Sequence, residues 1–557
     1  MSSGERLIYL PLGGAGEVGM NAYVYGYGAP GRERLILVDC GVTFPDMDTT
    51  PGVDLIFPDL SWLIERADRL EAIVITHAHE DHVGALGHFW RRLGAPVYCR
   101  RFTALHACRK LEEHGQDPAI VRVTGPRPET FEAGPFTLSF LPVSHSIPET
   151  SGLVIESPAG RVLHTGDFKL DPTPGVGEPW DPEAWRAAAG DGLQALVCDS
   201  TNVFVDHPGR SETGLTTALS DLVARQPGRV VATTFASNIT RLRTLAQAGQ
   251  AAGRRVVILG RAMNRMIAAG VEAGLLTDFP ETLSPEEARG VPRGELMMLV
   301  SGSQGERRAA SAQLAQGRYL GLSLSEGDLF LFSSRTIPGN ERGVIRVINQ
   351  LSEMGVDVVD DATDLYHVSG HANRPDLAAV HRLLSPRMVV PMHGEHRHLR
   401  AHQKLAQEAG LQSAITPNGT MLNLSGEGPT VVEQIEAGRR YLDGSVQIGA
   451  RDGVVRGRLR MALNGMVVVT LVIEEDGTPV GPPWVDQRGL PRTGPDGADW
   501  AAGLEDALDA LVKGADKRTR RDDDKLEEAL RKRVLSYADK AIGRRPEVLA
   551  VISRLEG

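Results

Sequence analysis

Three histidines and an aspartate crowd into six residues of the amino-terminal part of the chain. The run 76–82 reads THAHEDH and directly follows an apolar segment that is typical of a buried β-strand. Each buried imidazole needs its own hydrogen-bond partners, so an ordinary core explains a cluster this dense poorly. Where the strand ends, His77 and His79 can face one ion while Asp81 and His82 face a second. Imidazole and carboxylate ligands without a thiolate suit zinc or manganese.

Further side chains of metal-binding type each follow an apolar run of β character. They are His145, Asp167, Asp199, His371 and His393. Strands that are buried side by side bring their carboxyl-terminal ends to one rim of a sheet, so residues far apart in the sequence meet there. We therefore expect these side chains and the 76–82 cluster to form a single site.

A site with two divalent ions suits the hydrolysis of phosphodiesters. Ions about 3.5 to 4 Å apart lower the pKa of a shared water and hold the attacking and leaving oxygens of an in-line displacement. His371, if it lies near the leaving oxygen, could donate a proton, and a hydrogen bond with Asp199 would raise its pKa. A capping or packing role is the alternative for His371.

Two segments have the composition of a phosphate cradle. The first surrounds a histidine with small residues: Ser369, Gly370, His371 and Ala372. Backbone N–H groups could approach an anion closely there. In the second, Ser237 and Asn238 lie between an apolar run and a helical pattern, and helix amino termini attract phosphate. Ordinary helix caps are the alternative for both segments.

The composition is that of a soluble protein. Of the 557 residues, 41% are hydrophobic and 24% charged, which excludes disorder, collagen-like structure and a membrane bundle as the main architecture. No run approaches the roughly 18 apolar residues that span a bilayer, and the amino terminus lacks a signal-peptide pattern. The 4 cysteines form no C-x-x-C pair, which fits a reducing cytoplasm. A net charge of −11 argues against broad coating of nucleic acid and favours a narrow channel around one strand.

The order of the elements predicts layered α/β packing with an insertion. Short strand-like runs, such as 136–143 and 193–198, fill the first 200 residues, with helical patterns such as 84–93 between some of them. Strands and helices then alternate as in a doubly wound sheet. All 16 histidines lie between His77 and His402, and histidines return after this alternating segment, so we interpret it as an insertion.

The domain boundaries are predicted from the same pattern. Residues 1–207 and 365–450 form one domain, which the insertion 208–364 interrupts. A linker at 451–470 leads to a carboxyl-terminal domain at 471–557. A local excess of basic residues in this last domain is typical of a solvated helical face, and an oligomerisation role is the other interpretation.

The metal-binding motifs resemble those of the metallo-β-lactamase superfamily. The resemblance rests on HAHEDH at 77–82, on Asp39 within VDCG, on His145, and on Asp167 within TGD. This motif set is shared by hydrolases of many substrates, so the superfamily alone does not define the reaction.

Later motifs narrow the resemblance to the β-CASP nucleases. DST at 199–201, SGHA at 369–372 and PMHGE at 391–395 look like the three additional motifs of that family. SGSQGE at 301–306 and SRTIPGNE at 334–341 are similar to segments of the bacterial ribonuclease J group. The carboxyl-terminal extension is also similar in size and placement.

The resemblance implies an α/β fold: a metallo-β-lactamase αββα sandwich with an inserted doubly wound β-CASP domain and a small α+β carboxyl-terminal domain. It also implies two Zn²⁺ per subunit, with Mn²⁺ as a replacement or an additional ion. The implied ligands are His77, His79 and His145 for one ion, Asp81, His82 and His393 for the other, and Asp167 between them. Asp39 would orient a ligand or the bridging water, and initiation of a turn is its alternative role. The implied catalytic residues are Asp81, Asp167, His371 and Asp199.

The implied function is a ribonuclease that uses two metals to activate a bridging water or hydroxide, in RNA maturation and mRNA decay. It would act as a 5′-to-3′ exonuclease that favours 5′-monophosphate ends, and also as an endonuclease. Ser237, Asn238 and the 369–372 segment would bind the 5′-phosphate. The implied partners are single-stranded RNA, further copies in a homodimer or homotetramer, and an RNA-decay assembly, with no membrane.

Two alternatives belong to other functional classes. A small-molecule hydrolase of the same superfamily, a thioesterase or a lactamase, would not need the long insertion or the histidines beyond it. A non-catalytic scaffold would be expected to have lost metal ligands, whereas the set here is complete.

Overall fold

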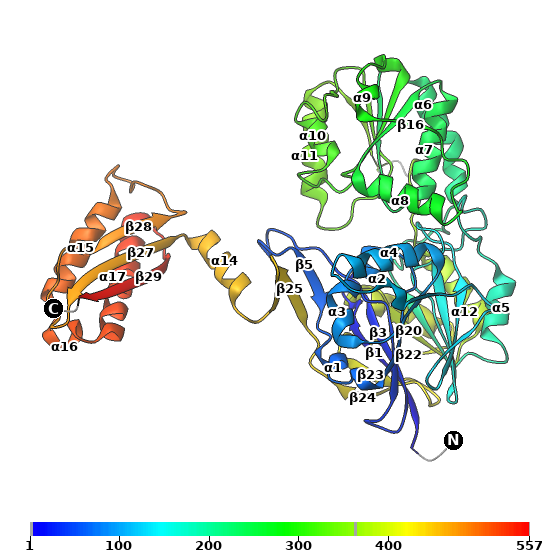
Figure 1. Cartoon of the computed structure of the whole chain (residues 1–557), viewed down its shortest axis with the longest axis horizontal. Helices are drawn as coiled ribbons and strands as arrows, with labels where there is room; N and C mark the ends of the chain where they lie inside the picture. The colour runs from blue at the N-terminus through cyan, green and yellow to red at the C-terminus, as the bar shows by residue number, and fades with distance from the viewer. Residues whose placement is uncertain (1–3, 361, 363–364, 556–557) are drawn as a thin grey trace. The chain divides into compact units, whose positions relative to one another are not determined.

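The computed structural model describes residues 4–360, 362 and 365–555 of the chain. It divides into two units, one of Met1–Thr43 with Phe57–Arg439 and the other of Phe44–Ile56 with Arg440–Gly557. Figure 1 follows the chain through both by colour, from blue at the amino terminus to red at the carboxyl terminus. Among the described residues, no helix is both long enough and apolar enough to cross a lipid bilayer.

Two β-sheets build the first part of the larger unit. The first sheet has the order β24-β23-β1-β3-β4-β6-β7-β8. Its strands are β1 (Arg6–Gly13), β3 (Ala22–Gly28), β4 (Arg34–Val38), β6 (Leu70–Val74), β7 (Val97–Cys99), β8 (Val121–Val123), β23 (Thr420–Asn423) and β24 (Thr430–Gln434). The second sheet has the order β22-β20-β13-β12-β11-β10-β9. Its strands are β9 (Phe131–Ala133), β10 (Phe136–Pro142), β11 (Ser151–Ser157), β12 (Gly160–His164), β13 (Ala195–Asp199), β20 (Met388–Met392) and β22 (Gln412–Ser413).

The two sheets pack face to face, with helices on their outer sides. Tyr9 and Tyr25 of the first sheet share a buried apolar cluster with Leu138 and Val197 of the second. Every residue of β13 is buried, as expected of a strand that is covered on both faces. The outer helices of the second sheet are α5 (Pro182–Ala189), α12 (Arg374–Leu384) and α13 (His396–Glu408). On the first sheet, α4 (Arg101–Glu112) contacts β8, and α3 (Leu86–Leu93) packs on α4.

A separate six-stranded sheet lies in the segment between β13 and β20. Its order is β16-β15-β17-β14-β18-β19, and all of its neighbouring strands are parallel. The strands are β14 (Val230–Thr233), β15 (Arg255–Leu259), β16 (Thr282–Leu283), β17 (Leu296–Val300), β18 (Leu329–Phe332) and β19 (Asp357–Val359). Helices α6 (Thr216–Arg225), α7 (Ile239–Ala251) and α8 (Arg261–Glu272) contribute to one apolar cluster with these strands. Helices α9 (Pro285–Ala288), α10 (Ala310–Ala315) and α11 (Glu341–Glu353) contribute to another.

The predicted fold class is confirmed by this arrangement: an αββα sandwich with an inserted doubly wound α/β domain. The insertion begins after β13 and ends before β20, although these strands are parallel neighbours in one sheet. Helix α12 carries the chain back to the start of β20, so the outward and return segments of the insertion meet near the end of β13, where Asn202 and Asn373 form a β-bridge.

A buried network of ion pairs connects the insertion to the sandwich. The Nε of Arg241 in α7 lies 2.6 Å from Glu212 Oε1, and its Nη1 donates to the carbonyl oxygen of Ser333 at 2.8 Å. Lys169, which follows β12 of the sandwich, lies 2.8 Å from Asp171 and 3.9 Å from Glu212. The Arg241 side chain is completely buried, so charges from the sandwich and from the insertion compensate each other out of contact with water.

The second unit contains a small α+β fold. Its sheet has the order β28-β27-β29. The elements are α14 (Val454–Asn464), β27 (Met466–Glu474), β28 (Trp484–Arg488), α15 (Trp500–Gly514), α16 (Lys517–Arg520), α17 (Asp523–Ile542) and β29 (Glu547–Leu555). Residues of β27 alternate between buried and partly exposed, and the buried face shares a cluster with α15 and α17. Another three-stranded sheet has the order β26-β25-β5. Its strands are β5 (Leu55–Pro58), β25 (Arg439–Asp443) and β26 (Val446–Gly449).

Several predicted boundaries differ from the structure by a few residues. The strand predicted at 193–198 is β13, which begins at Ala195 and extends to Asp199 because that residue still pairs with Met392 of β20. The helix predicted at 84–93 begins at Leu86, because Gly84 ends a preceding one-turn helix. The segment predicted as a linker, 451–470, contains α14 and the start of β27.

Candidate metal centre

The histidine cluster lies in the loop that follows β6. The strand ends at Val74, and the one-turn helix α2 (Glu80–Val83) begins directly after His79. The backbone N–H of Thr76 donates to Asp39 Oδ1 at 2.8 Å, and its hydroxyl donates to Asp39 Oδ2 at 2.9 Å. Asp39 follows β4, the neighbour of β6, and has a φ of 64°. One buried carboxylate therefore fixes the start of the loop.

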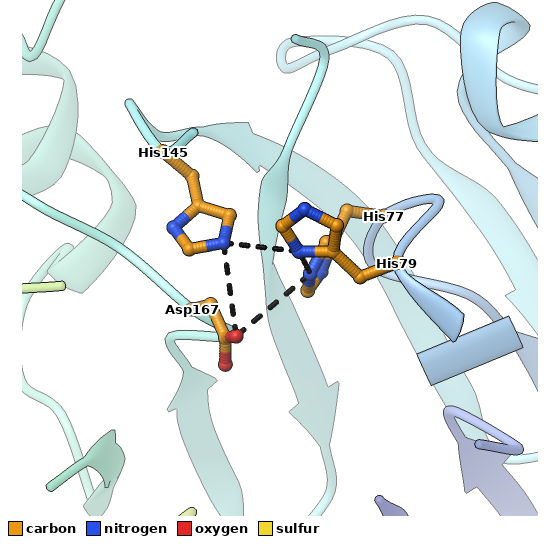
Figure 2. Close-up of side chains that lie close together, drawn as sticks. All are labelled: His77, His79, His145 and Asp167. Atoms are coloured by element: carbon orange, nitrogen blue, oxygen red, sulfur yellow. Dashed lines mark hydrogen bonds and ion pairs between the residues drawn. The ribbon is translucent and has the colours of Figure 1, made fainter. Parts of the chain in front are cut away.

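Three imidazoles and one carboxylate converge in the first ligand group, which Figure 2 shows. Nε2 of His77 lies 2.9 Å from Nδ1 of His79, which in turn lies 3.2 Å from Nε2 of His145. Oδ2 of Asp167 lies 3.8 Å from the Nε2 atoms of both His77 and His145. One ligand atom from each of the four residues falls within 4.8 Å of the others.

A second group shares the Asp167 carboxylate. His82 Nε2 lies 3.2 Å from Asp167 Oδ2 and 3.5 Å from Asp81 Oδ2. His393 Nε2 lies 3.3 Å from the same Asp81 oxygen. Oδ2 of Asp167 therefore faces both groups, which is the placement of a carboxylate able to bridge two ions.

Strand direction explains why residues so distant in sequence meet here. Strands β12, β13 and β20 are parallel neighbours, and β10 runs the same way because β10 and β12 are both antiparallel to β11. Asp199 ends β13, His393 directly follows β20, and His145 and Asp167 lie in the loops after β10 and β12. The structure thus gathers these strand-end residues on one rim.

The histidines of the first group favour the neutral form, which can bind a cation. Burial, reinforced by the neighbouring imidazoles, lowers the pKa of His77 and His145 well below the ordinary value. Burial also lowers the pKa of His79 to about 4. A neutral imidazole keeps one nitrogen lone pair available for a metal.

The second group carries an excess of negative charge. Burial opposes protonation of His393, yet the carboxylates of Asp167 and Asp199 raise its pKa to about 10. Burial is likewise outweighed at His82, whose pKa rises well above the ordinary value beside Asp167 and Asp81. Oδ1 of Asp167 is buried without a hydrogen-bond partner among the described residues, an arrangement that is costly unless another group satisfies it. The donor set therefore fits divalent metal.

The second ring nitrogen of each ligand histidine is also engaged. His82 Nδ1 lies 2.7 Å from Asp39 Oδ2, and His145 Nδ1 lies 2.6 Å from the carbonyl oxygen of Gly370. Such contacts fix the orientation of the ring and the nitrogen that faces a metal. Asp39 thus contacts the His82 ring, and its role in orienting a metal ligand stays a prediction.

Three further contacts of this kind come from hydroxyl groups, and sequence reasoning missed them. They are Thr76 Oγ1 at 3.0 Å from His77 Nδ1, Ser237 Oγ at 3.0 Å from His79 Nε2, and Thr201 Oγ1 at 2.7 Å from His393 Nδ1. Thr201 belongs to the DST motif and Thr76 precedes the cluster, so their positions offered a signal. Ser237 lies in the insertion, and nothing in the linear sequence pairs it with His79.

His371 and Asp199 form a close pair beside the ligand groups. Nδ1 of His371 lies 2.8 Å from Asp199 Oδ2. Burial disfavours the charged imidazole, but the Asp199 carboxylate raises the pKa of His371 above its ordinary value. The ring of His371 lies 5.0 Å from that of His145 and 5.6 Å from that of His393. The pair is thus positioned to hold a proton at the edge of the ligand groups.

The residues expected to bind phosphate have structural contacts of their own. The side chain of Asn238 accepts a hydrogen bond from the N–H of Arg241, which is the helix cap that the sequence offered as the alternative. Asn202 donates to Ser369 Oγ at 2.8 Å. A Cβ at Gly370 would lie 2.8 Å from the His145 ring, so only glycine lets this backbone approach the ligand. Ala372 is buried in the apolar core.

Four family models match successive parts of the chain. The model of the metallo-beta-lactamase superfamily matches residues 15–233, and that of the ribonuclease J beta-CASP domain matches 227–351. The Zn-dependent metallo-hydrolase RNA specificity domain matches 355–417, and the ribonuclease J C-terminal domain matches 453–555.

Curated relatives match over almost the whole length. Ribonuclease J of Sinorhizobium meliloti is 39% identical, over 100% of this chain and 98% of the relative. Ribonuclease J of Mycolicibacterium smegmatis is 35% identical over 97% and 96%, and that of Thermus thermophilus is 34% identical over 98% and 95%. A crystal structure of a protein of unknown function from Enterococcus faecalis has 17% identity and a TM-score of 0.50, and covers 75% of this chain and 100% of that chain. At that identity it supports the fold alone.

Proposed function

The chain belongs to the ribonuclease J family, metal-dependent ribonucleases of the metallo-β-lactamase superfamily, and we propose that it uses two divalent ions to hydrolyse RNA both from the 5′ end and internally. Zinc is the proposed ion, with manganese able to replace or supplement it. His77, His79 and His145 would hold one ion, and Asp81, His82 and His393 the other. The observation that carries this proposal is the single Asp167 oxygen that faces both ligand groups.

The side chains of the proposed centre have different roles in the reaction. When bound, the ions supply positive charge and Lewis acidity at the scissile phosphate. Asp167 and Asp81 place negative charge where the ions bind, and Asp39 keeps the His82 ring in position through their 2.7 Å contact. In its protonated form, which the Asp199 carboxylate favours by raising the pKa, His371 donates from Nδ1 to Asp199 and carries a second proton at Nε2. That proton is available for the leaving O3′ when the P–O bond breaks.

The substrate is proposed to be single-stranded RNA with a preference for a 5′-monophosphate. The backbone and hydroxyl groups of 369–372, with Ser237 and Asn238, would contact its phosphates. Homodimers or homotetramers assembled through residues 471–557, an RNA-decay assembly and a cytoplasmic location complete the proposal. We also propose 1–207 with 365–450, 208–364 and 471–557 as the domains, and 451–470 as the segment between the last two.

The activity is tested with end-labelled RNA. Purified protein freed of metal should leave a single-stranded 5′-monophosphate RNA intact, and added Zn²⁺ or Mn²⁺ should restore cleavage. The label at the 5′ end should appear as mononucleotide from exonuclease action and as longer fragments from internal cuts. RNA that stays intact with every metal, while a chromogenic lactam or a thioester is hydrolysed, would contradict the proposal.

Loss of the His371 side chain should slow cleavage without releasing metal. We expect His371→Ala to lower kcat on the order of 10²-fold, as for removal of a general acid, while metal content stays unchanged. Protonated His371 is the active form, so the rate should fall as pH rises through its pKa. Asp199→Asn removes the carboxylate that raises this pKa and should therefore shift the alkaline limb of the pH–rate profile to lower pH. The exposed His396→Ala is the matched control, and an unshifted alkaline limb in Asp199→Asn would refute the pairing.

A further inference from the structure

A separate cluster of metal-binding side chains lies on the outer face of the second sheet, beneath the helices that cover it. It consists of Cys198 in β13, His381 in α12 and His402 in α13. One ligand atom from each residue lies within 4.8 Å of the others, and the three residues are at most 1% exposed. None of them has a role in the proposed reaction.

The two imidazoles of this cluster are spaced like those of the first ligand group. Nε2 of His381 lies 3.1 Å from Nε2 of His402, and the ring centroids are 5.1 Å apart. In the first ligand group, the close nitrogen pairs are 2.9 Å and 3.2 Å apart, and the ring centroids are 4.8 to 5.1 Å apart. Two nitrogens that each lie about 2.0 Å from one ion stand roughly 3.3 to 3.5 Å apart, so a small adjustment lets this pair bind an ion.

A hydroxyl group orients the ring of His402. Oγ of Ser200 lies 2.8 Å from Nδ1 of His402 and donates to the carbonyl oxygen of Cys198 at 3.4 Å. The same oxygen can therefore accept the proton of Nδ1, which leaves Nε2 of His402 with a free lone pair. Contacts of this kind fix the nitrogen that a histidine presents to a metal, as the hydroxyl contacts do in the candidate metal centre.

Burial determines which ionic charge the cluster tolerates. Burial raises the pKa of the Cys198 thiol well above its ordinary value and lowers the pKa of His381 to about 4. Burial also lowers the pKa of His402 well below its ordinary value, so all three side chains are neutral without an ion. Cys198 shares an apolar cluster with Leu377 and Leu405 of the covering helices. A net charge would be costly in these surroundings.

We propose that Cys198, His381 and His402 form a site for one Cu⁺ ion, separate from the candidate metal centre. One thiolate and two imidazoles are a donor set that copper binds in trigonal geometry. On binding, the S–H bond of Cys198 breaks, an Sγ–Cu bond forms, and the proton leaves to solvent. The cluster is then neutral both before and after binding, whereas Zn²⁺ would leave one buried positive charge. The inference does not depend on the proposed nuclease activity.

The test uses the intact, zinc-loaded protein without oxygen, with a coloured chelator that competes for Cu⁺. The wild type should retain one Cu⁺ per chain while its zinc content stays unchanged. Cys198→Ser should bind Cu⁺ about 100-fold more weakly or worse, because loss of a ligand exceeds the loss of a contact that only orients one. Cys108→Ser removes a partly buried thiol outside the cluster and should bind Cu⁺ as the wild type does, which makes it the matched control.

A second variant and a spectrum make the result independent of any single substitution. His381→Leu removes one donor, suits the apolar surroundings and should weaken Cu⁺ binding to a similar extent. Urea unfolding without copper checks that each variant is folded, and X-ray absorption of the copper should show one sulfur and two imidazole nitrogens.

Three results would overturn the proposal: a wild type that retains no Cu⁺, folded Cys198→Ser and His381→Leu proteins that bind Cu⁺ as tightly as the wild type, or copper bound by two sulfurs. A third zinc ion per chain that is lost in Cys198→Ser would overturn the assignment to Cu⁺. A zinc-loaded protein that cleaves no RNA would overturn the proposed function and leave this site unaffected.

Discussion

Asp167→Asn is expected to reduce RNA cleavage on the order of 10³-fold or more and to release bound metal. The substitution keeps the shape of the side chain, but a neutral amide group then faces both ligand groups in place of the negatively charged carboxylate. His82 and His393 would then lose the carboxylate that contributes most to their raised pKa values. Metal content per chain, measured by mass spectrometry, should fall together with the rate of cleavage of an end-labelled RNA.

An exposed aspartate supplies the control for this effect. Asp191→Asn makes the same chemical change in the loop before β13 and should leave both metal content and cleavage at the wild-type level. Circular dichroism of Asp167→Asn should match the wild type, because the residue lies in a loop at the rim. An Asp167→Asn protein that retains its metal and more than a tenth of the activity would remove Asp167 from the proposed centre.

The second large effect is on stability. Arg241→Ala should lower the free energy of unfolding by about 3 to 5 kcal/mol, because it leaves Glu212 buried without its main counter-charge. The substitution also removes the donors to the carbonyl oxygens of Ser333 and Tyr366, at 2.8 Å and 3.2 Å. The shift of the urea unfolding transition, followed by far-ultraviolet circular dichroism, measures this loss.

Two further variants distinguish the effect of losing an ion pair from the effect of leaving a buried charge unpaired. Arg243, on the same helix, forms a partly exposed ion pair with Asp278, so Arg243→Ala should cost no more than about 1 kcal/mol. Replacing both buried partners, Arg241→Met with Glu212→Leu, should recover part of the stability lost in Arg241→Ala, since no unpaired charge remains. Equal shifts of the unfolding transition for Arg241→Ala and Arg243→Ala would show that the buried network stabilises the fold no more than the partly exposed ion pair does.

The clustering of the candidate metal-binding residues was predictable because it follows from strand direction. Carboxyl ends of parallel buried strands share one rim, so His145, Asp167, Asp199 and His393 could be placed together from the runs that precede them. The insertion was predictable for a related reason, because metal-binding residues occur on both sides of it. The assignment of each ion to its ligands came from the family resemblance and not from these patterns.

Contacts between side chains of the sandwich and the insertion could not be predicted in this way. Ser237 and His79 are 158 positions apart, and Arg241 and His367 are 126 apart. These pairs depend on how one folded domain rests on the other, and no local pattern encodes that.

The adjacency of β13 and β20 also sets an order of events during synthesis. Asp199 pairs directly with Met392, yet the ribosome must complete the whole inserted sheet before it makes β20. Domains fold as units in the order in which they emerge, so the insertion can fold while the second sheet still lacks a strand. His393, the last of the ligands, leaves the ribosome only after the insertion has been made. A nascent chain therefore lacks one member of the second ligand group until β20 has been made.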